Sequence, residues 1–496
     1  MKRILEKSFL LIVLSVLAIS CAKDDGPAPV ELDPVISSFA PKEGTVGSEV
    51  ILSGIGFGTN VPKNIVKFGD IEAEVRMASA KKIWVKVPEG ATTGKIYVTA
   101  YGYTLETKED FVVIKNPAKT LELDKVSMDL FTFETAALKA IVDGSNGTSV
   151  LWETDNEDVA TVDSNGTITA ISPGKAIISA SIDGLEAFCT VTVRPNIYIG
   201  GYINNGDKNV AMIWKNGEAQ PLMDGTSNSY VHAISVDGTD VYAVGYEEEN
   251  EIIYATLWKN GIPERLSNFA KGSAANSIVI DNGDVYAGGY DKTDTHYTVS
   301  LWKNGVKQQF ESSGSTSFAR SVQVLDGDVY AAGYEQYDSS NYVALWKNGQ
   351  LIQPSGEKGV VNSMFLAGQD IYLAGSTSGQ NNAIATIWVN GQPQYLSDGS
   401  LSTRAEAIHV DNGDVYVAGN YYSNGYVTML WKNGVLQEPS GTVGELHSIV
   451  VLDGQVYATG NTRKGNMSVA TIWINGVPTL LTDGSNNASA SSVFIR

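Results

Sequence analysis

The stretch Val241-Tyr242-Ala243-Val244-Gly245, followed after a short loop by Ala255-Thr256-Leu257-Trp258-Lys259-Asn260-Gly261, decides the fold because its pattern recurs along the chain. The unit Trp-x-Asn-Gly starts at Trp214, Trp258, Trp302, Trp346, Trp388, Trp431 and Trp473, which are 42–44 residues apart. The unit Tyr-x-x-Gly starts at Tyr198, Tyr242, Tyr286, Tyr330, Tyr372, Tyr416 and Tyr457. A repeat of ~40–45 residues with four strands is typical of a β-propeller.

Each repeat is predicted to form one four-stranded blade. In the second repeat the strands are expected at residues 232–236, 241–245, 255–258 and near 264–266. Asn260-Gly261 suits the positive φ angles of a type I′ hairpin. The recurring Trp and Tyr are expected to fill the space between neighbouring blades. The Asp-Gly-Asp turns are interpreted as hairpins and not as calcium sites, since Ala367-Gly368-Gln369-Asp370 breaks the set of ligands.

The two ends of the repeat region predict how the ring closes. Residues 197–201 form a second strand with no first strand before it, and residues 492–495 form a first strand with no second strand after it. Joining them completes seven blades within residues 197–496 and pairs two strand edges that would otherwise be exposed.

Comparison of the repeats separates constant turns from a variable face, where a binding site is expected. The first residue of the innermost strand is polar and differs among the blades: His232, Asn276, Arg320, Asn362, Glu406, His447 and Ser491. Aromatic residues expected on the same face are Tyr230, Phe318, Tyr337 and Tyr422. Unlike polar groups around one channel would orient a small ligand. The alternative is a water-lined channel without a specific ligand.

Composition excludes several functions. The chain has 35 Lys plus Arg against 55 Asp plus Glu, a net charge of −20, which argues against nucleic acid as a partner. Two cysteines and four histidines offer little for a metal site, and no cofactor is expected. The Gly-x-Ser-x-Gly elbow and the sialidase box Ser-x-Asp-x-Gly-x-Thr-Trp are absent. Glu406 with His447 or His232 remains an alternative acid and base pair.

The N-terminal residues are typical of a secretory signal. Residues 1–20 combine three basic residues with an apolar run that is too short to span a membrane. Ser20-Cys21 resembles the end of a bacterial lipobox, although Ala18 stands where that family usually has Leu. The resemblance implies that Cys21 is lipidated and that residues 21–33 form a linker. Lys23-Asp24-Asp25 resembles the export signal of Bacteroidetes surface lipoproteins.

Two segments between the linker and the repeats resemble immunoglobulin-like families. Residues 34–114 carry Gly54-Ile55-Gly56-Phe57-Gly58 and Val66-Lys67-Phe68-Gly69, and they resemble the IPT/TIG family. The glycine run is not interpreted as a phosphate loop, because no helix pattern follows it. Residues 119–194, with Leu151-Trp152-Glu153-Thr154 and the strand around Cys189, resemble the bacterial Ig-like group 2 family. Both resemblances imply β-sandwich spacers.

These observations predict an all-β protein with two Ig-like β-sandwiches followed by a seven-bladed β-propeller. It is expected to be lipid-anchored through Cys21 in the outer membrane and exposed to the cell exterior. The leading expected partner is an extracellular glycan, bound without catalysis. The alternatives are a protein-binding or adhesive module and a glycan-cleaving lyase or hydrolase.

Overall fold

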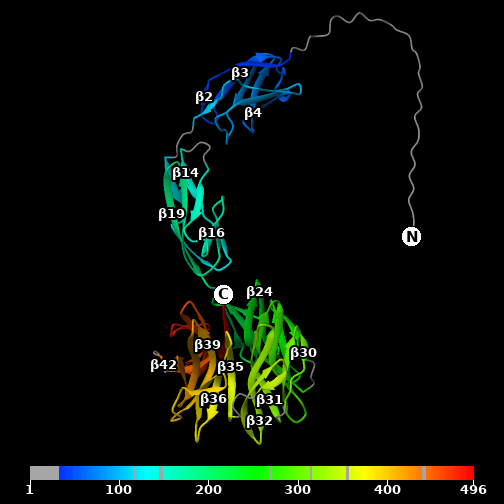
Figure 1. Cartoon of the computed structure of the whole chain (residues 1–496), viewed down its shortest axis with the longest axis vertical. Helices are drawn as coiled ribbons and strands as arrows, with labels where there is room; N and C mark the ends of the chain where they lie inside the picture. The colour runs from blue at the N-terminus through cyan, green and yellow to red at the C-terminus, as the bar shows by residue number, and fades with distance from the viewer. Residues whose placement is uncertain are drawn as a thin grey trace, which may run out of the picture. The chain divides into compact units, whose positions relative to one another are not determined.

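The computed structural model describes residues 33–114, 119–144, 149–267, 271–312, 315–352, 357–423, 425–437 and 443–496 (Figure 1). The predicted signal segment and Cys21 lie outside these residues. By its internal contacts the chain divides into two compact units, and the second consists of Phe131–Phe133 with Val193–Arg496. Among the described residues, no helix combines the length and the apolar character that a membrane crossing requires.

The segment that resembles the IPT/TIG family folds into antiparallel sheets around an apolar core. One sheet has the order β1-β3-β7-β6, formed by Val35–Ala40, Glu49–Ile55, Lys82–Lys86 and Val75–Ser79. The other has the order β5-β4-β8-β9, formed by Ile71–Ala73, Asn64–Phe68, Ile96–Ala100 and Tyr103–Glu106. Strand β10 (Val112–Val113) runs parallel to β2 (Glu43–Gly44), and a 3₁₀ helix spans Val61–Lys63.

The glycine run of this segment is explained by close packing. A Cβ on Gly54 would lie 2.0 Å from the carbonyl oxygen of Val35 and 2.6 Å from the ring of Phe57. Phe57 is buried in the core beside Leu52 and Phe68. The run therefore lets a strand approach its neighbour over a buried ring, which is a structural role.

The next segment forms smaller sheets with alternating burial. One sheet has the order β12-β19-β18-β15, formed by Ser127–Phe131, Leu185–Arg194, Gly174–Ile182 and Leu151–Thr154. A second has the order β13-β17-β16, formed by Thr135–Ala137, Thr167–Ala170 and Ala160–Val162, and β11 (Thr120–Leu123) pairs with β14 (Ala140–Asp143). Cys189 is fully buried on β19, and burial raises the pKa of its thiol, so it serves as a small apolar core residue.

The repeats form seven four-stranded sheets within the described residues, and we call these blades 1 to 7. Blade 1 contains β20 (Ile197–Asn204), β21 (Asn209–Lys215), β22 (Glu218–Pro221) and β47 (Ala488–Ile495). Blade 2 contains β23 (Ser229–Asp237), β24 (Asp240–Glu249), β25 (Ile252–Lys259) and β26 (Ile262–Arg265). Blade 3 contains β27 (Ser273–Asp281), β28 (Asp284–Lys292), β29 (Tyr297–Lys303) and β30 (Val306–Gln308).

The remaining blades repeat this order. Blade 4 contains β31 (Thr316–Leu325), β32 (Asp328–Tyr337), β33 (Ser340–Lys347) and β34 (Gln350–Ile352). Blade 5 contains β35 (Gly359–Ala367), β36 (Asp370–Ser378), β37 (Ala383–Val389) and β38 (Gln392–Tyr395). Blade 6 contains β39 (Ser402–Asp411), β40 (Asp414–Tyr422), β41 (Tyr426–Lys432) and β42 (Val435–Leu436). Blade 7 contains β43 (Gly444–Leu452), β44 (Gln455–Lys464), β45 (Met467–Ile474) and β46 (Val477–Leu480).

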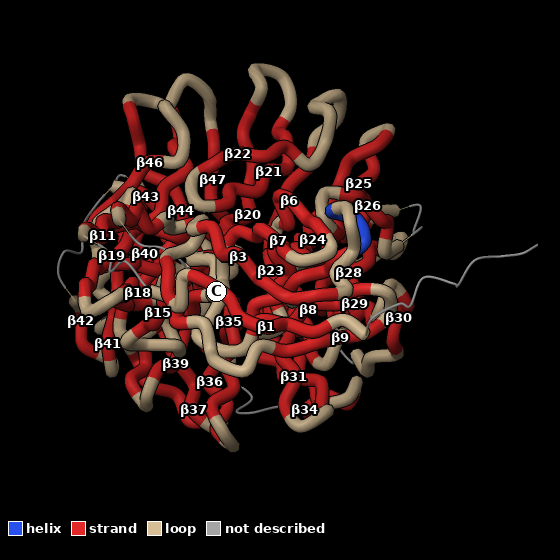
Figure 2. The backbone as a smooth tube through the Cα atoms, turned by 90° about the horizontal axis from the view of Figure 1, so that it is seen from above, coloured by secondary structure: helices blue, strands red, loops and turns tan. Residues whose placement is uncertain are grey.

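The C-terminal strand closes the ring as predicted. Strand β47 pairs antiparallel with β20, from Ile197 opposite Ile495 to Ile203 opposite Ala488. In Figure 2 the label of β47 accordingly lies with those of β20, β21 and β22. Both the all-β class and the closure by the last strand are therefore confirmed.

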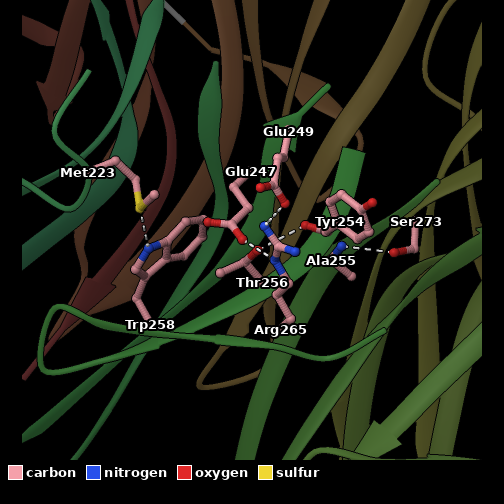
Figure 3. Close-up of polar contacts among 9 residues, drawn as sticks. All are labelled: Met223, Glu247, Glu249, Tyr254, Ala255, Thr256, Trp258, Arg265 and Ser273. Atoms are coloured by element: carbon pink, nitrogen blue, oxygen red, sulfur yellow. Dashed lines mark hydrogen bonds and ion pairs between the residues drawn. The ribbon is translucent and has the colours of Figure 1, made fainter. Parts of the chain in front are cut away.

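The recurring Trp and Tyr join neighbouring blades. Trp258 of blade 2 is fully buried against Tyr198 of blade 1, and Trp302 of blade 3 meets Tyr242 of blade 2 in the same way. Figure 3 shows two polar contacts of the same joints: Trp258 Nε1 lies 3.5 Å from Met223 Sδ, and the amide of Ala255 donates to Ser273 Oγ at 2.8 Å. The framework role predicted for these aromatics is confirmed.

Side-chain hydrogen bonds explain why Asn recurs in the Trp-x-Asn-Gly unit. Asn260 and Gly261 have φ of 50° and 81°, as a type I′ hairpin requires. Asn260 Oδ1 accepts from the amide of Val241, and its Nδ2 donates to Asp240, both at 2.8 Å. Lys259 also pairs with Asp240 at 2.9 Å. The last Asp of the Asp-Gly-Asp turn therefore binds protein groups, in agreement with the hairpin interpretation.

Candidate functional site

The seven polar residues that were predicted around the channel, which we call the ring residues, all occupy the same position in their blades. This position is not the predicted start of the innermost strand. Strand β23 begins at Ser229, so His232 lies inside the innermost strand and not at its start. The register between β23 and β24 shifts between Val231 and Ala233, which leaves His232 as the extra residue of a β-bulge. The same shift falls at Asn276, Arg320, Asn362, Glu406, His447 and Ser491. A bulge re-aims the side chain of its extra residue, which here points into the channel.

One cavity of about 440 Å³ is lined by all seven bulge residues, and we call it the channel cavity. Its other lining residues are Tyr202, Tyr230, Glu445, Asn461 and Ser489. The structure thus brings together the predicted ring and Tyr230, from seven blades that are distant in sequence. That these residues bind a ligand stays a prediction.

Hydrogen bonds to the next blade hold several ring side chains in place. His232 Nδ1 lies 3.0 Å from the carbonyl oxygen of Ala275, and Asn276 Nδ2 donates to that of Ala319 at 2.9 Å. Asn362 Nδ2 donates to the carbonyl oxygen of Ala405 at 3.1 Å and to Glu406 Oε2 at 3.0 Å. These groups are therefore fixed before any ligand arrives, which lowers the entropic cost of binding.

The serine that follows the bulge joins neighbouring blades, a role that was not predicted from the sequence. Ser321 Oγ accepts from the amide of Met364 in the next blade at 3.1 Å. The same bond to the next blade is made by Ser277, Ser363, Ser448 and Ser492. The signal was visible as a recurring Ser in the repeats, but its partner depends on the placement of the next blade.

The channel cavity has a mixed electrostatic character. Arg320 is exposed and is the one Lys or Arg among its described lining residues. Burial raises the pKa of Glu406, an effect that the Arg404 and Arg320 guanidinium groups oppose, and burial also raises the pKa of Glu445. Burial lowers the pKa of His232, and it lowers that of His447 to about 4. Both imidazoles are therefore neutral at pH 7 and can accept as well as donate hydrogen bonds.

At one recurring position of the second strand, blades 1 to 4 carry a tyrosine and blades 5 to 7 carry a polar residue. The residue after the Gly of Tyr-x-x-Gly is Tyr202, Tyr246, Tyr290 or Tyr334 in these blades, whereas blades 5 to 7 have Ser376, Asn420 and Asn461. The ring centroid of Tyr230 lies 4.8 Å from that of Tyr202 and 4.8 Å from that of Tyr246. Of these aromatic residues, Tyr202 and Tyr230 line the channel cavity, and Asn461 of blade 7 lines it as well. Alignment of the repeats could have revealed this asymmetry.

Three predicted aromatic residues do not line the channel cavity. Phe318 packs between Tyr290 and Tyr334, at centroid distances of 4.9 and 5.1 Å, because neighbouring rings enclose it. The Tyr337 hydroxyl donates to Glu335, which holds this side chain at the far end of β32. Tyr422 lines a separate cavity on blade 6. The prediction that all four aromatics surround one site is corrected to Tyr230 alone.

The predicted acid and base pair is not a close contact. Glu406 accepts from Asn362, while His447 Nε2 lies 3.3 Å from Asn461 Nδ2 and 3.7 Å from Glu445 Oε2. Within the described ranges, no group of three or more His, Cys, Asp and Glu side chains is placed to hold a metal ion.

Comparison with known proteins gives matches to domains and to distant structures. No curated protein matches the chain. A Bacteroides thetaiotaomicron protein of unknown function is 13% identical, with 94% of this chain and 99% of that chain covered and a TM-score of 0.29. An auxiliary nutrient binding protein from the same organism is 13% identical, with 86% and 94% covered and a TM-score of 0.26. The β-propeller domain of the Trilobed protease from Pyrococcus furiosus is 12% identical, with 74% and 99% covered and a TM-score of 0.36.

Those identities and TM-scores are too low to transfer a function. The two N-terminal segments, in contrast, match family models over most of their length. Residues 34–112 match the IPT/TIG domain, and residues 118–184 match the bacterial Ig-like domain (group 2), as their glycine and strand patterns indicated.

Proposed function

We propose that the channel cavity binds the end of an extracellular glycan without catalysis. The observation that carries this proposal is the set of seven unlike polar side chains, each raised on a bulge, around one cavity of about 440 Å³. The backbone forms the same bulge in every blade, so the fold itself does not require a different residue type at this position in each blade. A cavity of this size lies in the range that suits small ligands or the end of a longer one.

The chemistry of the lining favours a saccharide over an apolar ligand. Asn276, Asn362 and Asn461 present amides, Ser489 and Ser491 present hydroxyls, and the neutral imidazoles add further donors or acceptors. Sugar hydroxyls need both donors and acceptors. Tyr202 and Tyr230 add aromatic surface on one side, against which the C–H face of a sugar ring would pack.

Glycan cleavage is the second candidate, since Glu406 and Glu445 both line the cavity. Two carboxyl groups are what most glycoside hydrolases use, and burial raises both pKa values here. Glu406→Gln and Glu445→Gln separate the candidates: loss of product formation would establish hydrolysis, whereas the proposed function predicts no product from the unaltered protein.

The proposed setting is the outer surface of the outer membrane, with the chain anchored by lipid on Cys21. This part of the proposal rests on the N-terminal sequence alone. The two Ig-like segments would act as spacers between the lipid and the binding domain.

The test is a glycan array probed with the full chain, followed by calorimetry on any bound glycan. Arg320→Ala and Asn276→Ala should each weaken binding at least ~10-fold, equivalent to ~1.4 kcal/mol. Asp326→Asn in an exposed turn outside the cavity lining should leave the affinity unchanged. Binding that survives the channel variants, or no glycan bound at all, would refute the proposal and favour a protein partner.

A further inference from the structure

A second cavity, of about 420 Å³, lies on blade 6 and is lined by Ser402, Arg404, Asn420, Tyr422 and Tyr426. Strand register explains how these five residues meet. Ser402 pairs with Tyr422, which pairs with Tyr426, so these three form one row across β39, β40 and β41. Arg404 pairs with Asn420 in the next row on the same face. Directly opposite side chains in such rows are ~5 Å apart at Cβ and diagonal neighbours are ~7–8 Å apart, so the five side chains share one face of blade 6.

The two tyrosines of this cavity are available to a ligand. Tyr422 is 58% exposed and Tyr426 is 37% exposed. Their rings are T-shaped, with centroids 5.3 Å apart, so one ring presents its face where the other presents its edge. Elsewhere in blades 1 to 4 the aromatic rings near the channel are half-buried against one another, which makes this exposed pair unusual.

Arg404 acts on Glu406 through its charge, which opposes the rise that burial causes in the pKa of that carboxyl. Arg404 is exposed, and its guanidinium has no hydrogen bond or ion pair within the described parts of the chain. By contrast, Arg265 in blade 2 donates to both Glu247 and Glu249 and lies over the ring of Tyr254 (Figure 3). The position of Arg404, two residues before the bulge, is occupied in the other six blades by Ser489, Tyr230, Ala274, Phe318, Val360 and Glu445. Blade 6 alone therefore carries a cation there.

The other polar group of this cavity belongs to the wall. Asn420 Nδ2 donates to the carbonyl oxygen of Leu446 at 3.0 Å, and its Oδ1 accepts from the amide of Leu446 at 2.7 Å. Its amide thus joins blade 6 to blade 7 through one donated and one accepted hydrogen bond. Arg404 is left as the charged group that a ligand would meet.

This cavity adjoins the channel cavity. Arg404 lines one and Glu406, two residues further along β39, lines the other. Two residues of a strand span ~6.6 Å, which is close to the length of one sugar unit. An oligosaccharide whose end lies in the channel would therefore place a neighbouring unit at Arg404.

We propose that the blade 6 cavity is a second subsite, which binds a sugar unit carrying a carboxylate, such as a hexuronic acid. The inference rests on the proposed glycan function and narrows its ligand class. The guanidinium would donate two parallel hydrogen bonds to the carboxylate, and Tyr422 or Tyr426 would pack on the sugar ring. A local cation is needed because the chain carries a net charge of −20, which disfavours anions elsewhere on its surface.

The experiment compares uronic-acid oligosaccharides with their carboxyl-reduced neutral counterparts, first on an array and then by calorimetry with the full chain. The unaltered protein should bind the acidic member of a pair at least ~10-fold more tightly. Arg404→Gln should abolish this difference while leaving the affinity for the neutral member unchanged. Tyr422→Ala should weaken both members alike.

Lys292→Gln on blade 3 is the matched control, because it removes one exposed positive charge from another blade. It should preserve the preference for the acid. Equal binding of both members by the unaltered protein would overturn the inference but leave the proposed function intact, whereas binding of no glycan would refute the proposed function itself. Stronger binding of sulfated counterparts than of uronic acids would overturn the carboxylate assignment.

Discussion

Removal of the last strand tests how the propeller is closed. Strand β47 places Ala488, Ala490 and Val493 in the core between blades 1 and 7, with Ile495 packed against it. Burial of a Val or Ile side chain is worth ~1.5–3 kcal/mol, and each methyl of the two alanines adds ~0.8 kcal/mol. Deletion of residues 488–495 should therefore cost about 5 kcal/mol, before counting the exposed edge of β20.

That loss is comparable to the whole stability of many domains, which is ~5–15 kcal/mol. Urea unfolding followed by tryptophan fluorescence is a suitable assay, since Trp214 is fully buried in the same cluster. We expect the truncated chain to unfold at much lower urea and to aggregate through its free strand edge. Val493→Ala, a milder change at the same place, should cost ~1–2 kcal/mol. An unfolding curve that is unchanged by the deletion would refute closure by this strand.

Three further predictions address other features. Ser448→Ala should cost ~1 kcal/mol in the same urea assay, because the amide of Val493 loses its partner across the joint of blades 7 and 1; no change would show that this hydrogen bond is unimportant. The lowered pKa of His447, about 4 in the folded chain against ~6.5 when unfolded, means that the unfolded state binds more protons between these values, so stability should fall as the pH drops through this window. His447→Asn should remove on the order of 2 kcal/mol of the loss in unfolding free energy between pH 7 and 4.5. The raised pKa of neighbouring Glu445 has the opposite effect on stability, and it does so in both the unaltered chain and the variant. If both proteins lose stability identically with pH, the assignment to His447 is wrong. Cys21→Ser should release the chain from membranes, and Asp24→Ala with Asp25→Ala should protect it from protease added to intact cells, whereas a membrane-bound Cys21→Ser chain would exclude the lipid anchor.

Much of the fold follows from local sequence, because its signals are local. Asn260-Gly261 and its six counterparts favour positive φ angles whatever lies around them, so the hairpins and the repeat length could be predicted. The missing strand at each end of residues 197–496 then left one way to complete the ring. The ring of unlike polar residues could also be found, since comparison of the repeats shows where the chain varies without structural need.

What the sequence could not show depends on contacts between strands and between blades. The bulge at His232 exists only because β23 pairs with β24, and this pairing continues on the N-terminal side of the bulge to Ser229. The alternation of apolar and polar residues alone places the start of this strand at His232. Phe318 was predicted to face a ligand, but rings from neighbouring strands enclose it. Arg404 precedes Tyr422 and Tyr426 by about 20 residues, and the three share one face because the register of β39, β40 and β41 aligns them. The local pattern of alternating residues shows which face of a strand each side chain occupies. Which residues share a cavity depends instead on the register between strands, and the packing of the whole blade sets that register.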